Sequence, residues 1–178
     1  MAGGELQFWT RMLRFEGFEV VHVEEDTPCR RYSFTVVPTH GIGVCPQCGR
    51  ACEDVKQRRT REGIRDLPLG CNTVELKVRV SQYDCAHCQQ SFTPPIPFLA
   101  EGAHATERFM DRAAQLIRQG DIANAAQFLG VPEKTLENWY YDHLTRSQKS
   151  AASTPLLPIR RLGIDELSLK KSSDSSLP

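Results

Sequence analysis

The sequence predicts an α+β protein in which a small β-rich region precedes a helical region. Runs rich in β-branched residues occur early in the chain, and residues 74–80 alternate strictly between apolar and charged side chains. After His104 the apolar residues recur at helical spacing instead. Two pairs of cysteines fall within the β-rich part. With 178 residues, the chain is long enough for one compact domain or two small ones.

Composition narrows the class of protein. The 22 basic and 22 acidic side chains balance, which excludes a uniformly basic nucleic-acid coat and an acidic tail. The first residues do not have the pattern of a secretory leader, and no apolar run approaches the roughly 18 residues of a membrane helix. We therefore expect a cytoplasmic protein without a membrane partner. Its seven cysteines are then expected to stay reduced and to hold metal rather than form disulfides.

The β-rich region is expected to follow a short helix. Apolar residues recur at helical spacing over residues 5–15, and Gly17 ends that helix. Two β-branched runs, residues 18–24 and 31–37, are separated by a turn, which predicts a hairpin. The alternation over residues 74–80 predicts a further strand with one buried and one solvated face.

Four cysteines predict a tetrahedral zinc site. Cys45 and Cys48 form one pair, Cys85 and Cys88 the other, and the two intervening residues let each tight turn aim both sulfurs at one point. Four thiolates leave no open coordination position, so this Zn²⁺ would be structural. Two redox pairs or buried cysteines are the alternative interpretation.

The other cysteines carry separate expectations. Cys52 and His87 are the substitute ligands that we consider for the zinc site. Cys29 and Cys71 are expected to be small core residues, because free cysteine is among the residue types most often buried.

Residues 122–141 have the arrangement of a helix-turn-helix. Asp121 is a suitable N-cap for the first helix, and Gly130 allows a sharp turn after it. Pro132 begins the second helix, which is expected to end near His143. The alternative is an ordinary helical hairpin that packs against the β-rich region.

In DNA-binding versions of this motif the second helix enters the major groove. Asn138 is suited to reading adenine, and Lys134 to contacting guanine or a phosphate. The residues of this helix that we predict as DNA contacts are Lys134, Glu137, Asn138 and Tyr141.

Two further features lie outside these motifs. A basic stretch could follow a phosphate backbone or simply be a solvated face. Its members are Lys56, Arg58, Arg59, Arg61 and Arg65. Asp165 follows the apolar residues 162–164, and a carboxylate at a strand end can hold Mg²⁺. A surface acid after a strand is the alternative for Asp165.

Together these motifs resemble the N-terminal part of the insertion-sequence transposases of the ISL-three (ISL3) family. The resemblance includes the Cys45 knuckle, residues 61–69 leading through 74–80 to the second cysteine pair, and the helix-turn-helix. It also includes residues 162–171, which look like the opening strand of the catalytic domain of that family.

The resemblance implies a zinc-binding domain and a helix-turn-helix that bind the terminal inverted repeats of the element. It also implies a ribonuclease-H-like domain, whose Asp-Asp-Glu triad cuts and joins DNA with Mg²⁺ in the intact enzyme. Asp165 corresponds to the first acid of that triad, and the other two acids are absent from this sequence. We therefore expect a DNA-binding portion that is not catalytically competent alone. The expected partners are double-stranded DNA of transposon ends and a second copy or a full-length transposase.

The predicted regions are an N-terminal helix at 1–17, a β-rich zinc-ribbon-like domain at 18–98, a helix-turn-helix domain at 104–146, a linker at 147–158, and a stub strand of a ribonuclease-H-like domain with a disordered tail at 159–178. The alternative function is a zinc-ribbon module for protein interaction or transcriptional regulation. The weakly charged second helix favours that alternative.

Overall fold

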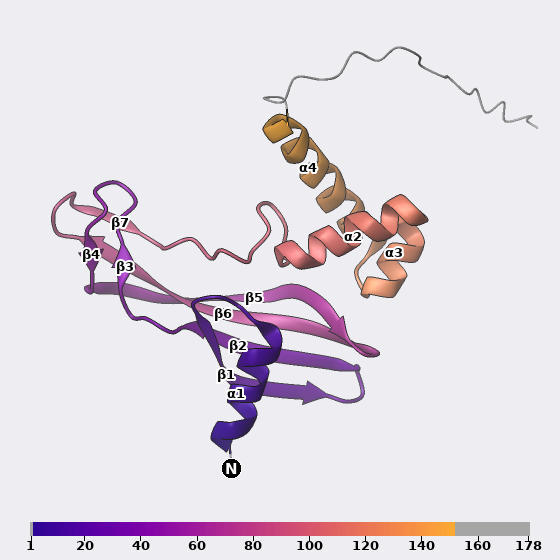
Figure 1. Ribbon diagram of the computed structural model, residues 1–178, viewed down its shortest axis with the longest axis horizontal. Coiled ribbons are helices and arrows are strands. Elements are labelled where there is room, and N and C mark those ends of the chain that lie inside the picture. The colour runs from indigo at the N-terminus through magenta and orange to yellow at the C-terminus, as the bar shows by residue number, and fades with distance from the viewer. Residues whose placement is uncertain (1, 152–178) are drawn as a thin grey trace, which may run out of the picture.

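A sheet of five strands fills the N-terminal part of the chain, and three helices follow it (Figure 1). The computed structural model describes residues 2–151, and it confirms the α+β class predicted from the sequence. In chain order the elements are α1 (Ala2–Leu13), β1 (Phe18–Asp26), β2 (Arg31–Pro38), β3 (Gly43–Val44), β4 (Ala51–Cys52), β5 (Val55–Leu69), β6 (Asn72–Cys85), β7 (Gln90–Phe92), α2 (Glu107–Gln119), α3 (Ile122–Leu129) and α4 (Glu133–Ala151).

Two hairpins and one parallel pairing set the order of the strands. β1 and β2 pair antiparallel, as predicted for residues 18–37, and β5 and β6 form a second, longer hairpin. β2 and β6 run parallel between them, which gives the order β1-β2-β6-β5, and β7 pairs with the end of β6. The chain between β2 and β5 carries the small β3–β4 hairpin, which projects beyond one end of the sheet (Figure 1).

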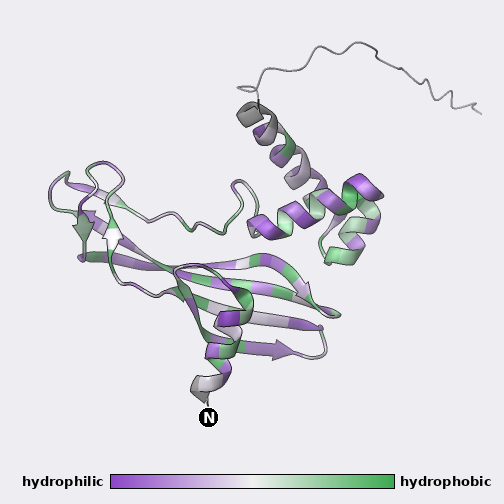
Figure 2. Ribbon diagram, viewed as in Figure 1, coloured by the Kyte–Doolittle hydropathy of each residue, from purple (hydrophilic) through white to green (hydrophobic). Residues whose placement is uncertain are grey.

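Alternation along β6 decides which face of the sheet is buried. Val74 and Leu76 are at most 1% exposed, whereas Arg79 is exposed on the opposite face. α1 packs on the apolar face, where the ring centroids of Trp9 and Phe34 lie 5.1 Å apart. Figure 2 shows hydrophobic and hydrophilic residues alternating along these strands. The other face therefore presents polar and charged side chains to solvent.

The C-terminal helices bury a separate apolar core. Phe109 and Met110 of α2 pack in one cluster with Ala126 of α3 and Leu136 of α4, and each of these side chains is at most 3% exposed. The alanine lets the helices approach closely, because it has no side chain beyond Cβ. This cluster is distinct from the core between α1 and the sheet. The two parts of the chain are therefore each held by their own apolar contacts.

α4 is longer than the sequence analysis predicts. The second helix is expected to end near residue 143 and a linker to begin at 147, but α4 continues to Ala151. The segment 147–151 contains neither proline nor glycine, and the first proline beyond it is Pro155, so nothing in it breaks the helix. The remainder of the predicted linker, the predicted stub strand and the predicted tail lie outside the described residues.

One buried carboxylate joins the sheet to the helices. Asp66 in β5 is 2% exposed and accepts hydrogen bonds from the Thr106 hydroxyl at 2.7 Å and from the Arg108 guanidinium at both oxygens. Arg108 also donates to the Leu13 carbonyl at the end of α1, at 2.6 Å, and lies over the ring of Phe15. Thr106 is at the same time the N-cap of α2. The Asp66 carboxylate thus ties β5, α1 and α2 together.

We predict that Asp66→Ala lowers the free energy of unfolding by about 3 kcal/mol, because it leaves a partly buried guanidinium and a buried hydroxyl without their acceptor. Chemical denaturation of the purified chain measures this change. The matched control is Glu24→Ala, which removes a half-exposed carboxylate from its ion pair with Lys77. That control should change the stability much less, because solvent screens an exposed ion pair. Equal stability of the two variants would contradict the role given to Asp66.

We also predict that Gly130→Ala is destabilising by about 1–2 kcal/mol. Gly130 ends α3 in the left-handed region at φ 64°, and a Cβ there would lie 2.7 Å from Cγ2 of Thr73. Gly4→Ala is the control, because Gly4 is an exposed residue of helix α1 with open space where a Cβ would lie. Thr73→Ser in the Gly130→Ala background should recover the part of the loss that comes from the close contact. Both effects are read from denaturation midpoints.

Candidate metal centre and nucleic-acid interface

The structure brings the two predicted cysteine pairs together. Cys45 and Cys48 lie in the turn between β3 and β4, and Cys85 and Cys88 lie where β6 turns towards β7. The four sulfur atoms all lie within 4.8 Å of one another, and those of Cys48 and Cys85 are 3.6 Å apart. Four sulfurs at tetrahedral Zn–S distances would be about 3.8 Å apart. The arrangement therefore fits a single tetrahedral zinc ion.

Both cysteine turns close in the same way. The backbone N–H of Gly49 donates to the Cys45 carbonyl at 2.8 Å, and that of Gln89 donates to the Cys85 carbonyl at 2.7 Å. Gly49 and Gln89 both have positive φ, 71° and 55°. A glycine follows the first cysteine pair, whereas the second turn adopts the same left-handed conformation with a glutamine. The two turns are structural equivalents that face one ion position.

Hydrogen bonding and burial shift the pKa values of Cys85 and Cys88 in opposite directions. Backbone N–H groups of Cys88 and His87 donate to the Cys85 sulfur and lower the pKa of that thiol to about 6, against the effect of burial. The pKa of Cys88 is raised to about 12, because its thiol is hydrogen-bonded to Cys48 and shielded from water. Cys85 thus ionises more readily than Cys88. A divalent cation bound to the sulfurs would supply the charge that lets Cys88 ionise as well.

The remaining candidate ligands lie outside this group of four. Cys52 is 8% exposed beside it, and burial raises the pKa of its thiol to about 11. His87 is exposed, with Nδ1 at 3.8 Å from the Cys88 sulfur. The expectation that Cys29 and Cys71 are core residues is wrong: both are exposed. Each lies in a tight turn at an end of a strand pair, where the chain is at the surface.

The predicted helix-turn-helix is formed by α3, a three-residue turn and α4. The Asp121 side chain accepts from a backbone N–H at 2.8 Å and caps α3, as predicted. Gly130 ends α3 in the left-handed conformation, and Val131 is buried beneath the turn. Leu136 is fully buried, and Trp139 packs against the same cluster. These contacts orient α4 with one face inward and the opposite face towards solvent.

The outward face of α4 carries the residues predicted for it. Lys134, Asn138 and Tyr141 are exposed, and Glu137 is partly exposed. Lys134 donates to the Glu137 carboxylate at 2.7 Å. This pair sits three residues apart in the helix and leaves the face with little net positive charge. The exposed side chains of Asn138 and Tyr141 can nevertheless contact a binding partner.

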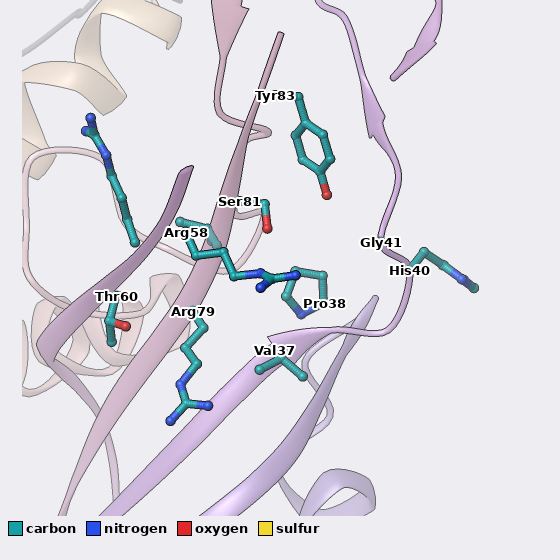
Figure 3. Close-up of a pocket in the computed structure, with 11 residues that line it drawn as sticks. Val37, Pro38, His40, Gly41, Arg58, Thr60, Arg79, Ser81 and Tyr83 are labelled. Atoms are coloured by element: carbon teal, nitrogen blue, oxygen red, sulfur yellow. The ribbon is translucent and has the colours of Figure 1, made fainter. Parts of the chain in front are cut away.

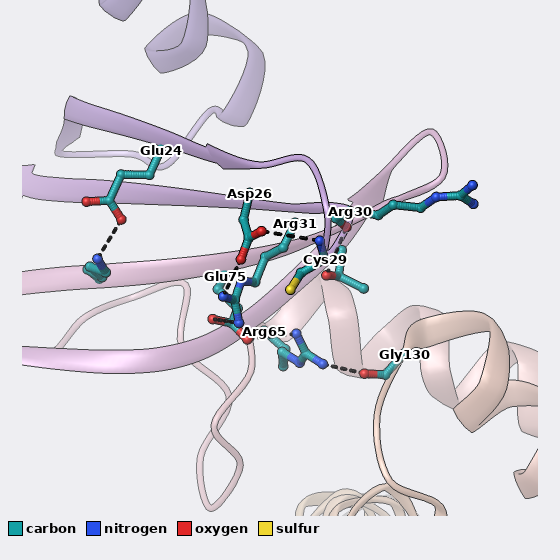
Figure 4. Close-up of polar contacts among 10 residues, drawn as sticks. Glu24, Asp26, Cys29, Arg30, Arg31, Arg65, Glu75 and Gly130 are labelled. Carbon is teal, nitrogen blue, oxygen red and sulfur yellow. Dashed lines mark hydrogen bonds and ion pairs between the residues drawn. The ribbon is translucent and has the colours of Figure 1, made fainter.

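The predicted basic stretch forms most of β5, and two of its members are already paired. Lys56 lies 3.3 Å from the carboxylate of Asp84. Arg65 forms an ion pair with Glu75 at 2.9 Å and donates to the Gly130 carbonyl in the helix-turn-helix turn. Figure 4 shows Arg65 between these two partners. Arg65 therefore connects the sheet to the turn rather than standing free as a phosphate contact.

The other three members present their charge to solvent. Arg58, Arg59 and Arg61 are exposed, and no ion pair involves them among the residues that the structure describes. Arg59 is hydrogen-bonded to the side chain of Gln57. The sequence analysis missed Arg79, which is exposed on the neighbouring strand β6. The alternation over residues 74–80 already placed it on the solvated face, and that signal could have added it to the basic set.

The described part of the chain contains no helix that is both long and apolar enough to span a membrane. Asp165, predicted as the first acid of a catalytic triad, lies outside the described residues.

Comparisons with known proteins relate both parts of the chain to one family. Residues 43–88 match the zinc-finger of the transposases IS204/IS1001/IS1096/IS1165, and residues 94–144 match the helix-turn-helix domain of transposase family ISL3. Together the two matches cover more than half of the chain. The first contains all four clustered cysteines, and the second contains α2, α3 and most of α4.

A curated relative agrees with these matches. The chain is 27% identical over 161 residues to the transposase for insertion sequence element IS1001 of Bordetella parapertussis. The alignment covers 88% of this chain but 38% of the length of that transposase. No solved structure matches the chain. The chain thus belongs to the ISL3 family of transposases and carries the zinc-finger and helix-turn-helix domains of that family.

Proposed function

We propose that this chain recognises the terminal inverted repeats of an insertion sequence through its helix-turn-helix, with zinc stabilising the adjoining β hairpins. The observation that carries the proposal is the orientation of α4. Its inner face is held by Leu136 and Trp139, while Lys134 and Asn138 remain exposed near its N-terminal end. In a helix-turn-helix that end of the second helix contacts base edges in the major groove.

The chemistry of the exposed α4 residues suits this role. The amide of Asn138 can pair with both edge atoms of adenine, and Lys134 can donate to guanine or to a phosphate after it leaves Glu137. Arg59 and Arg61 of β5 are exposed and have no ion pair within residues 2–151, so they add positive charge at the sheet. Contacts of that kind depend on salt and carry no sequence information, so base selection would rest on α4.

Arg65 supports a single combined binding surface. It bridges Glu75 of the sheet and the carbonyl of Gly130, which lies in the turn between α3 and α4. Asp66, the next residue, holds the start of α2 through Thr106 and Arg108. Two adjacent residues of β5 therefore fix the helices against the sheet. The basic strand β5 and helix α4 would then contact DNA at a fixed distance from each other.

Zinc is proposed to stabilise only the end of the sheet. The cysteine cluster forms its own buried group with Tyr83 and Phe92, distinct from the apolar core under α1. β3 and β4 are only two residues long each, and short hairpins of this size are not stable without additional support. The ion would supply that support through the four sulfurs.

We predict one zinc ion per chain when the protein is purified under reducing conditions, measured by elemental mass spectrometry. Removal of zinc with a chelator should increase amide hydrogen exchange in residues 43–54 and 83–92 at least tenfold, because folding of these hairpins is coupled to the metal. Exchange in the buried half of β6, residues 74–78, should change little.

Two cysteine variants complete this test. Cys85→Ser should lose zinc, whereas Cys71→Ser, an exposed cysteine outside the cluster, should retain it. A chain that contains no metal, and whose exchange is the same with and without chelator, would refute the zinc assignment.

We predict that the chain binds duplexes that carry ISL3-type terminal inverted repeats in preference to scrambled duplexes of the same length. Lys134→Ala with Asn138→Ala should reduce that preference by about 10- to 100-fold, since each good base contact contributes about 1–3 kcal/mol. Fluorescence anisotropy at fixed salt measures both affinities. The thermal midpoint should stay unchanged, because both side chains are exposed.

Gln119→Ala serves as the control, because Gln119 is an exposed polar residue at the end of α2. It should keep the preference for the repeats. If the wild-type chain holds zinc but binds neither duplex in a salt-dependent way, the alternative of a protein-interaction or regulatory module is favoured. That alternative rests on the Lys134–Glu137 ion pair, in which the carboxylate neutralises the positive charge of Lys134 on the exposed face of α4.

A further inference from the structure

A hollow opens on the sheet where β2 separates from β6. The two strands pair only as far as Val36 and Val78, after which β2 ends at Pro38 while β6 continues to Cys85. Proline has no N–H to continue the ladder, so the chain leaves the sheet at this point. The resulting hollow has a volume of about 620 Å³ and lies between this departing segment and the β5–β6 hairpin (Figure 3).

The register of β5 and β6 places four hydrogen-bond donors on one face beside this hollow. Arg58 is opposite Ser81, and Thr60 is opposite Arg79. Residues directly opposite in a sheet share a face, and so do residues two apart on one strand. The four side chains therefore form a patch of two guanidinium groups and two hydroxyl groups. Figure 3 shows Arg58 extending from β5 towards Pro38 and Arg79 extending from β6 in a different direction, with His40 on the opposite side of the hollow.

No carboxylate lines this hollow. Arg58 and Arg79 have no ion pair among the described residues. Other basic residues of the same sheet do have one, for example Lys77 with Glu24 at 2.8 Å. Glu24 and Glu62 line a neighbouring hollow, to which Thr60, Lys77 and Arg79 also contribute. Arg58 and Arg79 are diagonal neighbours on adjacent strands, and an anion that approaches both would be attracted by two positive charges.

We infer that Arg58 and Arg79 bind one phosphate group of the DNA backbone, with Thr60 and Ser81 as additional donors. Guanidinium groups match the geometry of phosphate oxygens, and hydroxyl groups are common phosphate contacts. The inference rests on the proposed function, and it adds a contact on the sheet that is separate from α4.

The surroundings favour a backbone phosphate over a free nucleotide. The strand beside the hollow carries two further exposed cations: Arg59, which also lines the hollow, and Arg61, which the register places opposite Val78. The lining contains one tyrosine and no phenylalanine or tryptophan of residues 2–151; that tyrosine, Tyr83, is 4% exposed and already stacked on Phe92. The exposed imidazole of His40 at the rim is then the one exposed aromatic ring in the lining on which a nucleotide base could stack. Inorganic phosphate shares the charge chemistry, so the experiment must separate these two sources.

The test uses the zinc-loaded chain and a 20-base-pair duplex of random sequence, with affinity measured by anisotropy from low to physiological salt. Arg58→Gln with Arg79→Gln should weaken binding about tenfold at low salt. It should also lower the slope of log affinity against log salt concentration by about one, as expected for the loss of one phosphate contact. Lys77→Gln is the matched control, because it removes a charge from the same face that is already paired. It should leave the slope unchanged.

The outcomes separate this site from the proposed function. The preference for inverted repeats over scrambled duplex should survive in the double variant, because a phosphate contact is blind to sequence. An unchanged salt slope in a double variant that retains zinc and its thermal midpoint would overturn the site, whether or not the wild type prefers the repeats. The site is also overturned if millimolar inorganic phosphate raises the midpoint of the wild type but not of the variant while DNA binding is equal. In contrast, a wild type that binds random duplex with the expected slope but shows no preference for repeats would leave the site standing and refute the proposed function.

Discussion

The carboxylate of Asp66 is the interaction on which the arrangement of this protein depends. It is buried in β5, and its two oxygens hold the N-cap of α2 and an arginine that reaches back to the end of α1. The sheet and the helical part each have their own apolar core, so apolar contact alone would leave them loosely joined. A buried ion pair has a demanding geometry, because both charges must be satisfied once they are removed from water. This geometric requirement fixes the orientation of the helices relative to the sheet.

The cations of this protein divide into those that hold the fold and those that are free. Arg65 and Arg108 are bound to carboxylates and backbone carbonyls at the junction, and Lys56 is paired near the metal centre. Arg58 and Arg79 face solvent without an ion pair in the part of the chain that the structure describes. A charge already neutralised in the fold contributes little to attracting a polyanion. Fewer cations are therefore available to bind DNA than the number of basic residues in the sequence suggests.

The cysteine cluster stabilises a region that the apolar cores do not reach. β3, β4 and β7 are two or three residues long and extend beyond the part of the sheet covered by α1 (Figure 1). Four sulfurs converge there from both hairpins, and hydrogen bonds from backbone N–H groups lower the pKa of Cys85. Metal binding replaces the apolar burial that such short strands cannot provide. Apolar burial therefore stabilises the main part of the sheet, and metal binding would stabilise its end.

Features that depend on neighbours along the chain could be predicted from the amino-acid sequence alone. The caps at Asp121 and Gly130, the N-terminal hairpin, the alternation of β6 and the cysteine turns follow from short-range periodicity and from the φ angles that turns require. The predicted end of α4 near His143 was wrong: the helix continues to Ala151, because no helix-breaking residue occurs before Pro155.

Which charges are paired and which surfaces are free depends on how distant segments of the chain pack together. The partners of Asp66 lie about 40 residues further along the chain, and the turn that Arg65 contacts lies 65 residues away. Arg79 joins Arg58 because a hairpin register sets their strands side by side. Cys29 and Cys71 are exposed because their turns lie at the surface of the sheet. Local pattern carries no information on contacts made across such separations, since these arise when distant segments pack together.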